Sequence, residues 1–337
     1  MKKKAGILTR LLLLVNFLFS LGLILAYLAS YINPEQFVFI AFFGLAYPVF
    51  LIGNLFFILL WLLFRKRYFI LPLLLILLGW NHFQRHYQFR GKELDSKTEY
   101  PIKILSYNVK NLANSNYGIE NKTLRESIFH FLKREQPKIL CLQEFRLPAR
   151  DAAKVLDNLK REIGLPYLFY KNYRQETREI DGLNIFTNYP VINKGSVAID
   201  DEHIFAIFVD LVMADDTFRV YNAHYESIRF KDQDYEFVSD LTDDGQTEQK
   251  FSEGSINILN KLGRAFQKRG MQVDILCYHM KNSPYPIILC GDFNDTPSSY
   301  VYRETSGDMK DAFMESGSGY NNTYAGALPP LRIDYIL

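Results

Sequence analysis

Residues 287–294 read Ile-Ile-Leu-Cys-Gly-Asp-Phe-Asn, a short apolar run that stops abruptly at polar residues. The apolar part, Ile287 to Cys290, has the length and composition of a buried strand. Asp292 and Asn294 follow at once, in a setting where Gly, Asp and Asn also favour a simple turn. In layered α/β folds, ligands bind where strands end, because loops there carry functional side chains on a rigid scaffold. The stretch therefore predicts a strand that ends at a functional site.

Three more apolar runs stop at a polar side chain in the same way. They place Asn108 after Ile104-Leu105-Ser106-Tyr107, Glu144 after Cys141-Leu142-Gln143, and His224 after Val220 to Ala223. Each has an ordinary structural interpretation: Asn108 as a turn residue, Glu144 as a surface charge and His224 as a satisfied structural histidine. Because four apolar runs of one chain end at a polar side chain, we expect these side chains to form one shared site.

Short apolar strands and helical patterns alternate along the last two thirds of the chain, which indicates a layered α/β domain. The predicted strands cover residues 102–109, 138–143, 183–187, 204–213, 218–223, 287–290 and 332–337. A long amphipathic helix is predicted from one apolar stripe, formed by Ile256, Leu259, Leu262, Phe266, Val273 and Leu276. The acidic, aperiodic segment 226–249 is expected to be a surface loop.

The first quarter of the chain is strongly apolar and predicts a membrane anchor over residues 1–90. Residues 7–32 and 37–64 are each long enough to span a hydrocarbon core as a helix. A cleavable signal peptide is the alternative for the first, but its apolar run is longer than a signal core and a second span follows. Residues 68–83 form a weaker third span. Residues 91–101 are predicted to be a linker, and residues 102–337 the soluble domain.

Basic residues mark cytoplasmic loops, so Lys2 to Lys4 and Arg65 to Arg67 should lie on the same, inner side. If the third segment also crosses, everything after Arg85 is extracytoplasmic. If that segment only lies in the interface, the soluble domain stays in the cytoplasm. We expect three crossings, and hence an integral protein of a bacterial inner membrane with its soluble domain extracytoplasmic.

Composition gives no indication of a nucleic-acid-coating surface, a disulfide framework or a zinc cluster. The net charge of +2 gives no support for a surface that coats nucleic acid. The three cysteines, Cys141, Cys277 and Cys290, have neither the number nor the spacing of a disulfide framework or a zinc cluster. Because Cys141 and Cys290 lie inside apolar runs, we expect them to be buried small hydrophobes.

Taken in order, these pieces resemble the endonuclease/exonuclease/phosphatase superfamily, which includes DNase I, exonuclease III enzymes, inositol polyphosphate 5-phosphatases and neutral sphingomyelinases. The matching elements are Ser106-Tyr107-Asn108, Leu142-Gln143-Glu144, Gly182 to Pro190, Asn222-Ala223-His224, Gly291-Asp292-Phe293-Asn294 and Arg332-Ile333-Asp334-Tyr335. The resemblance covers essentially all of the chain after the linker. It implies a DNase I-like two-sheet α/β sandwich and a phosphoester hydrolase, most often a phosphodiesterase.

The resemblance also implies roles for particular residues. Glu144 would be the principal ligand of Mg²⁺ or Mn²⁺, with Asn108 beside it, since these cations prefer oxygen ligands. His224 would donate a hydrogen bond to the phosphoryl oxygen or help to protonate the leaving group. Asp292 and Asn294 would orient the attacking water. Asp334 would steer a histidine of a later Ser-Asp-His element. That element does not precede Leu337, so the chain is expected to be truncated at its C-terminus and strongly impaired.

The sequence leaves two questions open: the class of substrate, and whether the protein is an enzyme or a binding protein. The substrate can be nucleic acid, phospholipid or a soluble phosphate ester; a bilayer anchor favours lipid slightly, and no extended basic and aromatic stripe indicates a nucleic-acid groove. The alternative to an enzyme is a non-catalytic membrane receptor or scaffold on the same fold. The lipid bilayer is the one partner inferred, and no protein partner is predicted.

Overall fold

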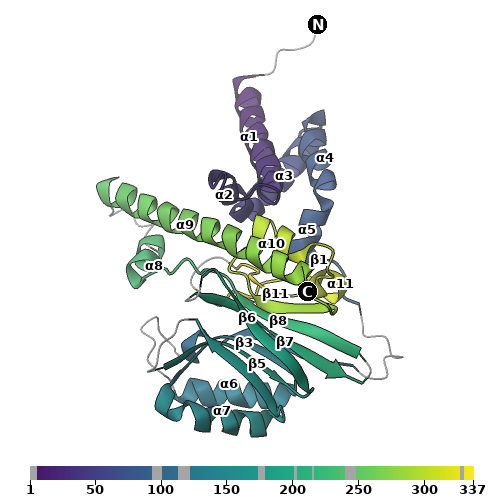
Figure 1. The fold of residues 1–337 in the computed structure, drawn as a ribbon. Helices are drawn as coiled ribbons and strands as arrows, with labels where there is room; N and C mark the ends of the chain where they lie inside the picture. Colours follow the sequence, from purple (N-terminus) through teal and green to yellow (C-terminus); the bar gives the residue numbers. More distant parts are fainter. Residues whose placement is uncertain are drawn as a thin grey trace.

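In the computed structural model, an N-terminal group of helices stands on one side of a two-sheet sandwich (Figure 1). The structure describes residues 6–92, 101–112, 122–173, 179–200, 203–214, 216–239, 248–326 and 330–337. Most of the predicted linker, residues 93–100, lies outside these ranges. The two-sheet α/β sandwich predicted from the sequence is confirmed.

The helical unit, residues 7–86, contains five helices within the described residues. They are α1 (Ile7–Ala29), α2 (Phe39–Leu45), α3 (Tyr47–Leu63), α4 (Ile70–Leu78) and α5 (Trp80–His86), with a 3₁₀ turn η1 (Arg67–Phe69) before α4. Among the described residues, α1 is the one helix long and apolar enough to cross a membrane by itself. The pair α2 and α3 passes the same test as one broken span.

The second and third predicted spans are therefore not continuous helices. The chain bends by 60° between α2 and α3, and Pro48, in the first turn of α3, has no N–H with which to continue the preceding helix. The third span breaks at Gly79, where an added Cβ would lie 2.1 Å from the Tyr27 ring, so that a close approach to α1 requires glycine. How many times the chain crosses a membrane stays a prediction.

Within the described ranges, nine strands form the two layers of the sandwich. One sheet has the order β2-β3-β5-β4, with β2 (Ile104–Asn108), β3 (Ile139–Pro148), β5 (Glu179–Thr187) and β4 (Tyr167–Asn172). The other has the order β11-β9-β8-β7-β6, with β11 (Asp334–Ile336), β9 (Ile287–Asp292), β8 (Asp216–His224), β7 (Ile204–Met213) and β6 (Val191–Ala198). The neighbours β2 and β3 are parallel, as are β8 and β9. Each parallel pair therefore ends its strands at the same edge.

Helices cover the outer faces of the sandwich (Figure 1). α6 (Lys122–Glu135) and α7 (Ala149–Ile163) pack on the four-stranded sheet through an apolar cluster. α9 (Glu248–Lys281) and α10 (Tyr300–Ser306) pack on the five-stranded sheet. The remaining short elements are α8 (Asp232–Ser239), α11 (Ala312–Ser316), the 3₁₀ turn η2 (Lys110–Leu112), β1 (Tyr87–Gln88) and β10 (Gly319–Tyr320). The segment 226–249 is thus not a loop throughout, because α8 and the start of α9 lie in it; residues 240–247 are outside the described ranges.

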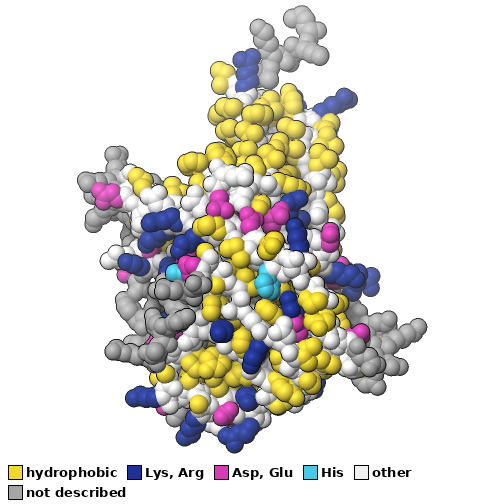
Figure 2. All heavy atoms as spheres, in the orientation of Figure 1, with side chains coloured by type: hydrophobic (Ala, Val, Ile, Leu, Met, Phe, Trp, Pro, Cys, Tyr) yellow, Lys and Arg dark blue, Asp and Glu magenta, His cyan; other side chains and the backbone are white. Residues whose placement is uncertain are grey.

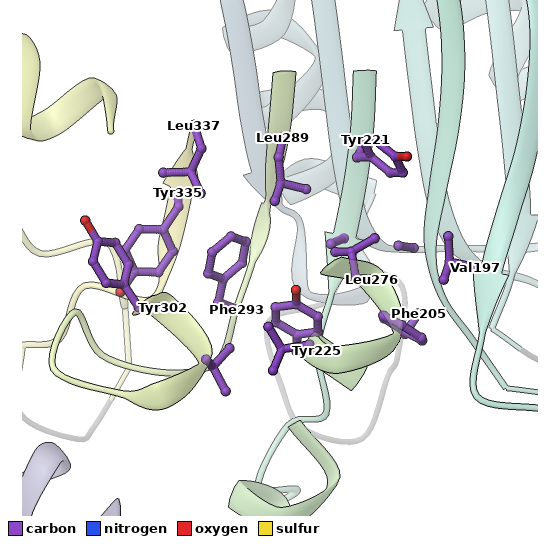
Figure 3. Packing of buried hydrophobic residues seen from close by; sticks show 14 of the residues in the cluster. Val197, Phe205, Tyr221, Tyr225, Leu276, Leu289, Phe293, Tyr302, Tyr335 and Leu337 are labelled. Atoms are coloured by element: carbon purple, nitrogen blue, oxygen red, sulfur yellow. The ribbon is translucent and has the colours of Figure 1, made fainter. Parts of the chain in front are cut away.

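An apolar core fills the space between the sheets. It includes Ile139, Ile185, Ile207 and Val220, and Cys141 and Cys290 are fully buried in it, as expected. A second cluster, beneath α9 and α10, contains Phe293, which stacks on Tyr335 with ring centroids 4.6 Å apart (Figure 3). The phenylalanine of the Gly-Asp-Phe-Asn element therefore packs into the core, while its polar neighbours remain at the sheet edge.

A buried set of side-chain amides joins the two sheets beneath that edge. Gln143, on β3, donates from Nε2 to Oδ1 of Asn222 on β8, at 2.6 Å. The Asn222 Nδ2 in turn donates to the carbonyls of Leu142 and Asn184, each at 2.9 Å. Because both amides are fully buried, these bonds fix how the two layers lie relative to each other.

The helical unit makes direct contacts with the sandwich. Ser298 is the central contact: its carbonyl accepts from Ser30 Oγ, and its Oγ bonds His86 Nε2, both at 3.0 Å. Arg332 donates to the Arg85 carbonyl at 3.2 Å, and β1 pairs with β10. Ser298 lies four residues after Asn294, so the docking contact and the predicted site share one loop.

Gly291→Ala tests the close packing of β8 against β9. An added Cβ would lie 2.0 Å from the Ala223 carbonyl oxygen, a contact that requires the backbone to move. We expect a loss of stability of about 1–3 kcal/mol or more in thermal unfolding. Gly263→Ala on α9 is the control, since its Cβ would meet Val38 at an ordinary 3.5 Å and helix propensity favours alanine. Equal stability of the two variants would contradict the packing described.

Candidate active site

The carboxyl ends of the two parallel strand pairs meet at one end of the sandwich, around an open cleft. Asn108 ends β2 and Glu144 lies in β3, while His224 and Asp292 are register partners that end β8 and β9. All of the site residues predicted from the sequence line this cleft, namely Asn108, Glu144, His224, Asp292, Asn294 and Asp334. Their assigned chemical roles remain predictions.

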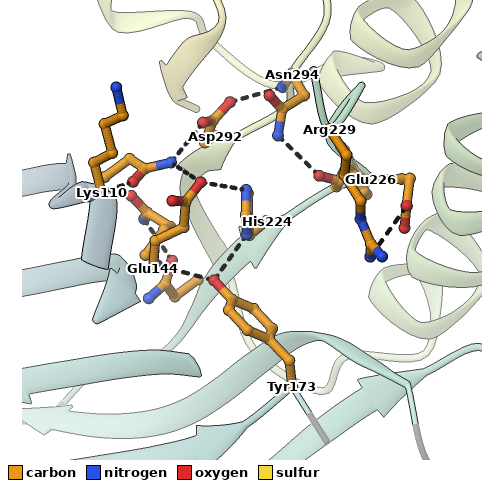
Figure 4. A network of polar contacts seen from close by, with 12 residues as sticks. Lys110, Glu144, Tyr173, His224, Glu226, Arg229, Asp292 and Asn294 are labelled. Atoms are coloured by element: carbon orange, nitrogen blue, oxygen red, sulfur yellow. Dashed lines mark hydrogen bonds and ion pairs between the residues drawn. The ribbon is translucent and has the colours of Figure 1, made fainter. Parts of the chain in front are cut away.

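Asn108 bridges two carboxylates from different sheets (Figure 4). Its Nδ2 donates to Glu144 Oε1 and to Asp292 Oδ2, both at 2.9 Å. Its Oδ1 accepts from the backbone N–H of Lys110, also at 2.9 Å, which fixes the orientation of the amide. The two acidic groups are therefore held side by side by one amide.

Glu144 sits at an irregularity in its strand. The β3–β5 register shifts between Leu142 and Phe145, and Glu144 has a φ of 50°, in the left-handed region that non-glycine residues rarely adopt. Such bulges re-aim a side chain, and backbone strain of this kind gathers at functional sites. The bulge directs the Glu144 carboxylate toward Asn108 and His224 rather than along the regular alternation of the strand.

His224 is oriented by Tyr173, a residue that the sequence analysis did not identify. The Tyr173 hydroxyl accepts from the Glu144 N–H at 2.9 Å and lies 2.7 Å from His224 Nδ1 (Figure 4). Because the Tyr173 hydroxyl already accepts from the Glu144 N–H, it can donate its own proton to His224 Nδ1. The backbone N–H, the hydroxyl and the ring nitrogen then all have hydrogen-bond partners. In this arrangement Nδ1 is the acceptor, and the proton that faces the cleft is on Nε2.

The other ring nitrogen of His224 points into the site. His224 Nε2 lies 3.5 Å from Glu144 Oε1 and, among the described residues, is a buried nitrogen with no hydrogen-bond partner. Buried polar atoms without partners are uncommon and need an explanation. A ligand oxygen in the cleft would provide the partner.

Asp292 and Asn294 are fixed by a tight turn after β9. The Asn294 N–H donates to Asp292 Oδ1 at 2.7 Å, and the Asn294 side chain donates to the Tyr225 carbonyl at 2.9 Å. Asn294 has a φ of 51°, which asparagine tolerates better than most residues. The same turn thus positions one carboxylate and one carboxamide at the floor of the cleft.

Asp334, on β11, is the register partner of Asp292 and lies beside it. Burial raises the pKa of Asp334 well above its usual range, and the charge of Asp292 raises it further. Burial also raises the pKa of Asp292, although His224 and the hydrogen bond from Asn108 oppose this. The two carboxyl groups therefore hold protons to a higher pH than isolated aspartates.

The oxygen atoms that line the cleft are suitable ligands for a hard divalent cation. Glu144, Asp292 and Asp334 offer carboxylate oxygens, the ligands that Mg²⁺ and Mn²⁺ prefer. In the described parts of the chain, no group of three or more His, Cys, Asp or Glu side chains is gathered closely enough to hold a metal ion by itself. Mg²⁺ typically takes one or two carboxylates and completes its shell with water and substrate oxygens, so this donor set fits it.

Comparison with known proteins gives a family for the sandwich. A family model described as the Endonuclease/Exonuclease/phosphatase family matches residues 105–337, and this match confirms the resemblance indicated by the ordered motifs. A second model, described as a domain of unknown function, matches residues 9–86. No curated protein matches the chain.

Several solved structures are similar to this chain at low sequence identity. The human Nocturnin catalytic domain with bound sulfate is 18% identical, with 70% of this chain and 82% of that chain covered and a TM-score of 0.46. A Staphylococcus aureus beta toxin mutant with bound magnesium ions is 15% identical, with 70% and 83% covered and a TM-score of 0.44. ANGEL2, a 2',3'-cyclic phosphatase, is 17% identical, with 60% and 55% covered and a TM-score of 0.39.

Tyr173→Phe tests the orientation of His224. Removing the hydroxyl leaves the Glu144 N–H and His224 Nδ1 without their shared partner, which should cost about 1–3 kcal/mol of stability. Heteronuclear NMR of the imidazole should show the proton on Nε2 in the native protein and a mixture of tautomers in the variant. Tyr221→Phe is a matched control, because its hydroxyl lies 2.8 Å from Nδ1 of a different histidine, His279. An unchanged His224 signal in Tyr173→Phe would refute this role.

Asp334→Asn tests the cost of the buried acidic pair. A folded-state pKa above the ordinary 3.8 means that Asp334 destabilises the cation-free protein progressively as pH rises from about 3.8 through the folded value. The amide removes this cost, so the variant should be more stable at neutral pH, by about 1.4 kcal/mol for each unit of pKa elevation. Near pH 4 the difference should largely disappear.

The control for this experiment is Asp311→Asn, whose carboxylate is buried in an ion pair with Arg332. Breaking a buried pair leaves an uncompensated charge, so this variant should lose stability at neutral pH. Chemical denaturation in the presence of a chelator measures both variants. Lower stability of Asp334→Asn at neutral pH would show that Asp334 is not under electrostatic strain.

Proposed function

We propose that this chain, which belongs to the Endonuclease/Exonuclease/phosphatase family, is a membrane-anchored phosphodiesterase that depends on Mg²⁺ or Mn²⁺. Members of the family hydrolyse phosphate esters. The observation that carries the proposal is the Asn108 amide, which holds the carboxylates of Glu144 and Asp292 together beside His224 Nε2, a buried nitrogen with no hydrogen-bond partner in the described part of the chain.

Glu144, with Asp292 and Asn108 beside it, would hold the divalent cation. When bound there, such a cation neutralises charge on the non-bridging phosphate oxygens and lowers the pKa of a bound water. The side chain of Glu144 is about a quarter exposed, enough for a solvated ion to reach it. The hydrogen bond from Asn108 goes to Glu144 Oε1 and leaves Glu144 Oε2 for the cation, whereas Asp292 Oδ1 already accepts from the Asn294 N–H.

His224 would stabilise the phosphoryl group through the proton on Nε2. Tyr173 keeps that proton on the nitrogen that faces the cleft, so the donor is aligned before the substrate arrives. Preorganised donors of this kind are a large source of catalysis, because no reorganisation is needed as negative charge develops.

Asp292 would accept a proton from the attacking water. A general base works best when its pKa is close to the working pH, and burial, together with the charge of Glu144, raises the pKa of Asp292 in that direction. Asn294, held by the same turn, would hydrogen-bond the water or the phosphate. In a single in-line displacement, the water oxygen would bond to phosphorus as the ester P–O bond breaks, and the leaving oxygen would take a proton from water in the open cleft.

The helical unit would hold this site at a membrane. Large apolar side chains are more than half exposed along α1, α3 and α4, including Leu14, Phe17, Leu59 and Leu74, and hydrophobic atoms dominate this surface (Figure 2). In Figure 1, α1 begins far from the sandwich, α3 leads away from it, and α4 and α5 return to it. This arrangement supports three crossings, with Arg65 to Arg67 on the far side and the sandwich extracytoplasmic.

Glu144→Gln tests the proposed function. The substitution keeps the shape of the side chain but removes its charge, so Mg²⁺-dependent hydrolysis of a simple phosphodiester should fall by about 10² or more. Glu304→Gln, which lies outside the cleft, should keep its rate, and a chelator should abolish the activity of the native chain. Running the same assay on duplex DNA, single-stranded DNA, sphingomyelin and inositol phosphates separates the substrate classes. Full turnover by Glu144→Gln would rule out this site as the hydrolytic centre.

A further inference from the structure

One face of helix α9 contacts the helical unit. Gly263 lies against Val38, Phe266 makes an edge-on contact with Phe42 at 5.2 Å between ring centroids, and Gly270 faces Asn33. An added Cβ at Gly270 would lie 2.7 Å from the Asn33 side-chain oxygen, so the helix and the turn before α2 are closely apposed. These α9 residues are separated by three and four positions, so they form a single stripe along the helix.

The stripe continues toward the N-terminal end of α9, beyond the last contact with the helical unit. Leu259 and Ile256 precede Gly263 by four and seven residues and therefore lie on the same face. Their side chains are 51% and 55% exposed, although they belong to a face that is otherwise buried against α2. Single exposed apolar residues are ordinary, but these two extend a packed stripe and form a surface that no described part of the chain covers.

The neighbouring part of the helical unit is exposed and apolar as well. Phe37 and Phe39, at the start of α2, are 52% and 67% exposed. In Figure 1, the N-terminal end of α9 rises to the level of α2, where the helices of the proposed anchor emerge toward the sandwich. The exposed surface of α9 is therefore continuous with the apolar surface of the proposed membrane anchor.

We propose that Ile256 and Leu259 insert into the interfacial layer of the bilayer, so that the N-terminal half of α9 lies on the membrane surface. This inference rests on the proposed membrane anchoring. Helices that lie in the interface carry apolar residues on one face and basic residues beside it. Arg264, eight residues after Ile256, is exposed and lies about 80° around the helix from it, so it can approach anionic headgroups.

The membrane contact would set the position of the active-site cleft. Lys268, Met271 and Gln272, which are offset around α9 from the stripe, line the cleft. Gln272 accepts a hydrogen bond from the Glu226 N–H at 2.8 Å, which ties the helix to the loop after β8. One helix diameter, about 10 Å, would therefore separate the cleft from the bilayer surface. Phosphoesters at that surface would be directly accessible.

Site-directed spin labelling of the full chain in vesicles of phosphatidylcholine and phosphatidylglycerol tests this inference. Cys141 and Cys290 are fully buried, so a Cys277→Ser background allows single labels at positions 256 and 259. Position 192 is the matched control, because Ile192 on β6 is an isoleucine with 57% exposure. Position 14 on α1 reports on the anchor itself. The measurement compares collision of each label with oxygen, which enters bilayers, and with a water-soluble nickel chelate.

Labels at 256 and 259 should collide with oxygen more than with nickel, whereas the label at 192 should show the reverse. Nickel access at 256 and 259 equal to that at 192 would overturn the inference. Protection from both reagents would also overturn it, since it would show a protein partner such as a second copy of the chain. If position 14 reports lipid while 256 and 259 report water, the membrane surface on α9 fails and the anchor stands. If position 14 also reports water, the anchoring proposal fails too.

Discussion

The two hydrogen bonds donated by Asn108 join the layers of the sandwich at its functional edge. Asn108 and Glu144 belong to the four-stranded sheet, whereas Asp292 belongs to the five-stranded sheet, so one amide sets the spacing of carboxylates from both. Just beneath it, the buried Gln143–Asn222 bond fixes the same two sheets. The constraint is geometric: parallel strands that end together bring their terminal side chains together, and the amides keep the two ends in register.

Much of this arrangement could be predicted, because the strands and the polar residues that end them follow from short local patterns of apolar and polar residues. Strand 204–213 was predicted with the bounds of β7, and each polar residue that ends an apolar run lies in the cleft. Helix α7 was missed although its buried residues recur at helical spacing, so its signal was present. Tyr173 had no local signal, since its role depends on β4 pairing with β5 beside β3. The interrupted spans reflect Pro48 and Gly79, whose effects depend on the packing of neighbouring helices.

The loop after β9 connects the candidate site to the helical unit. It begins with Asp292 and Asn294, and Asp295 is held by the buried guanidinium of Arg269 at 3.0 Å. Four residues after Asn294, Ser298 bonds both Ser30 and His86 of the helical unit. A rigid loop with one end in the cleft and the other on the helices leaves little freedom for the sandwich to turn. The cleft therefore has a defined orientation relative to the proposed bilayer.

The central claim, that the edge organised by Asn108 is a divalent-cation site of a phosphoester hydrolase, is tested most directly by diffraction. Crystals of the protein soaked in Mn²⁺ would be measured at a wavelength where manganese scatters anomalously. The account predicts one strong anomalous peak within about 2–2.5 Å of carboxylate oxygens of Glu144 or Asp292. An empty cleft at saturating Mn²⁺, or a peak bound only elsewhere on the molecule, would contradict it.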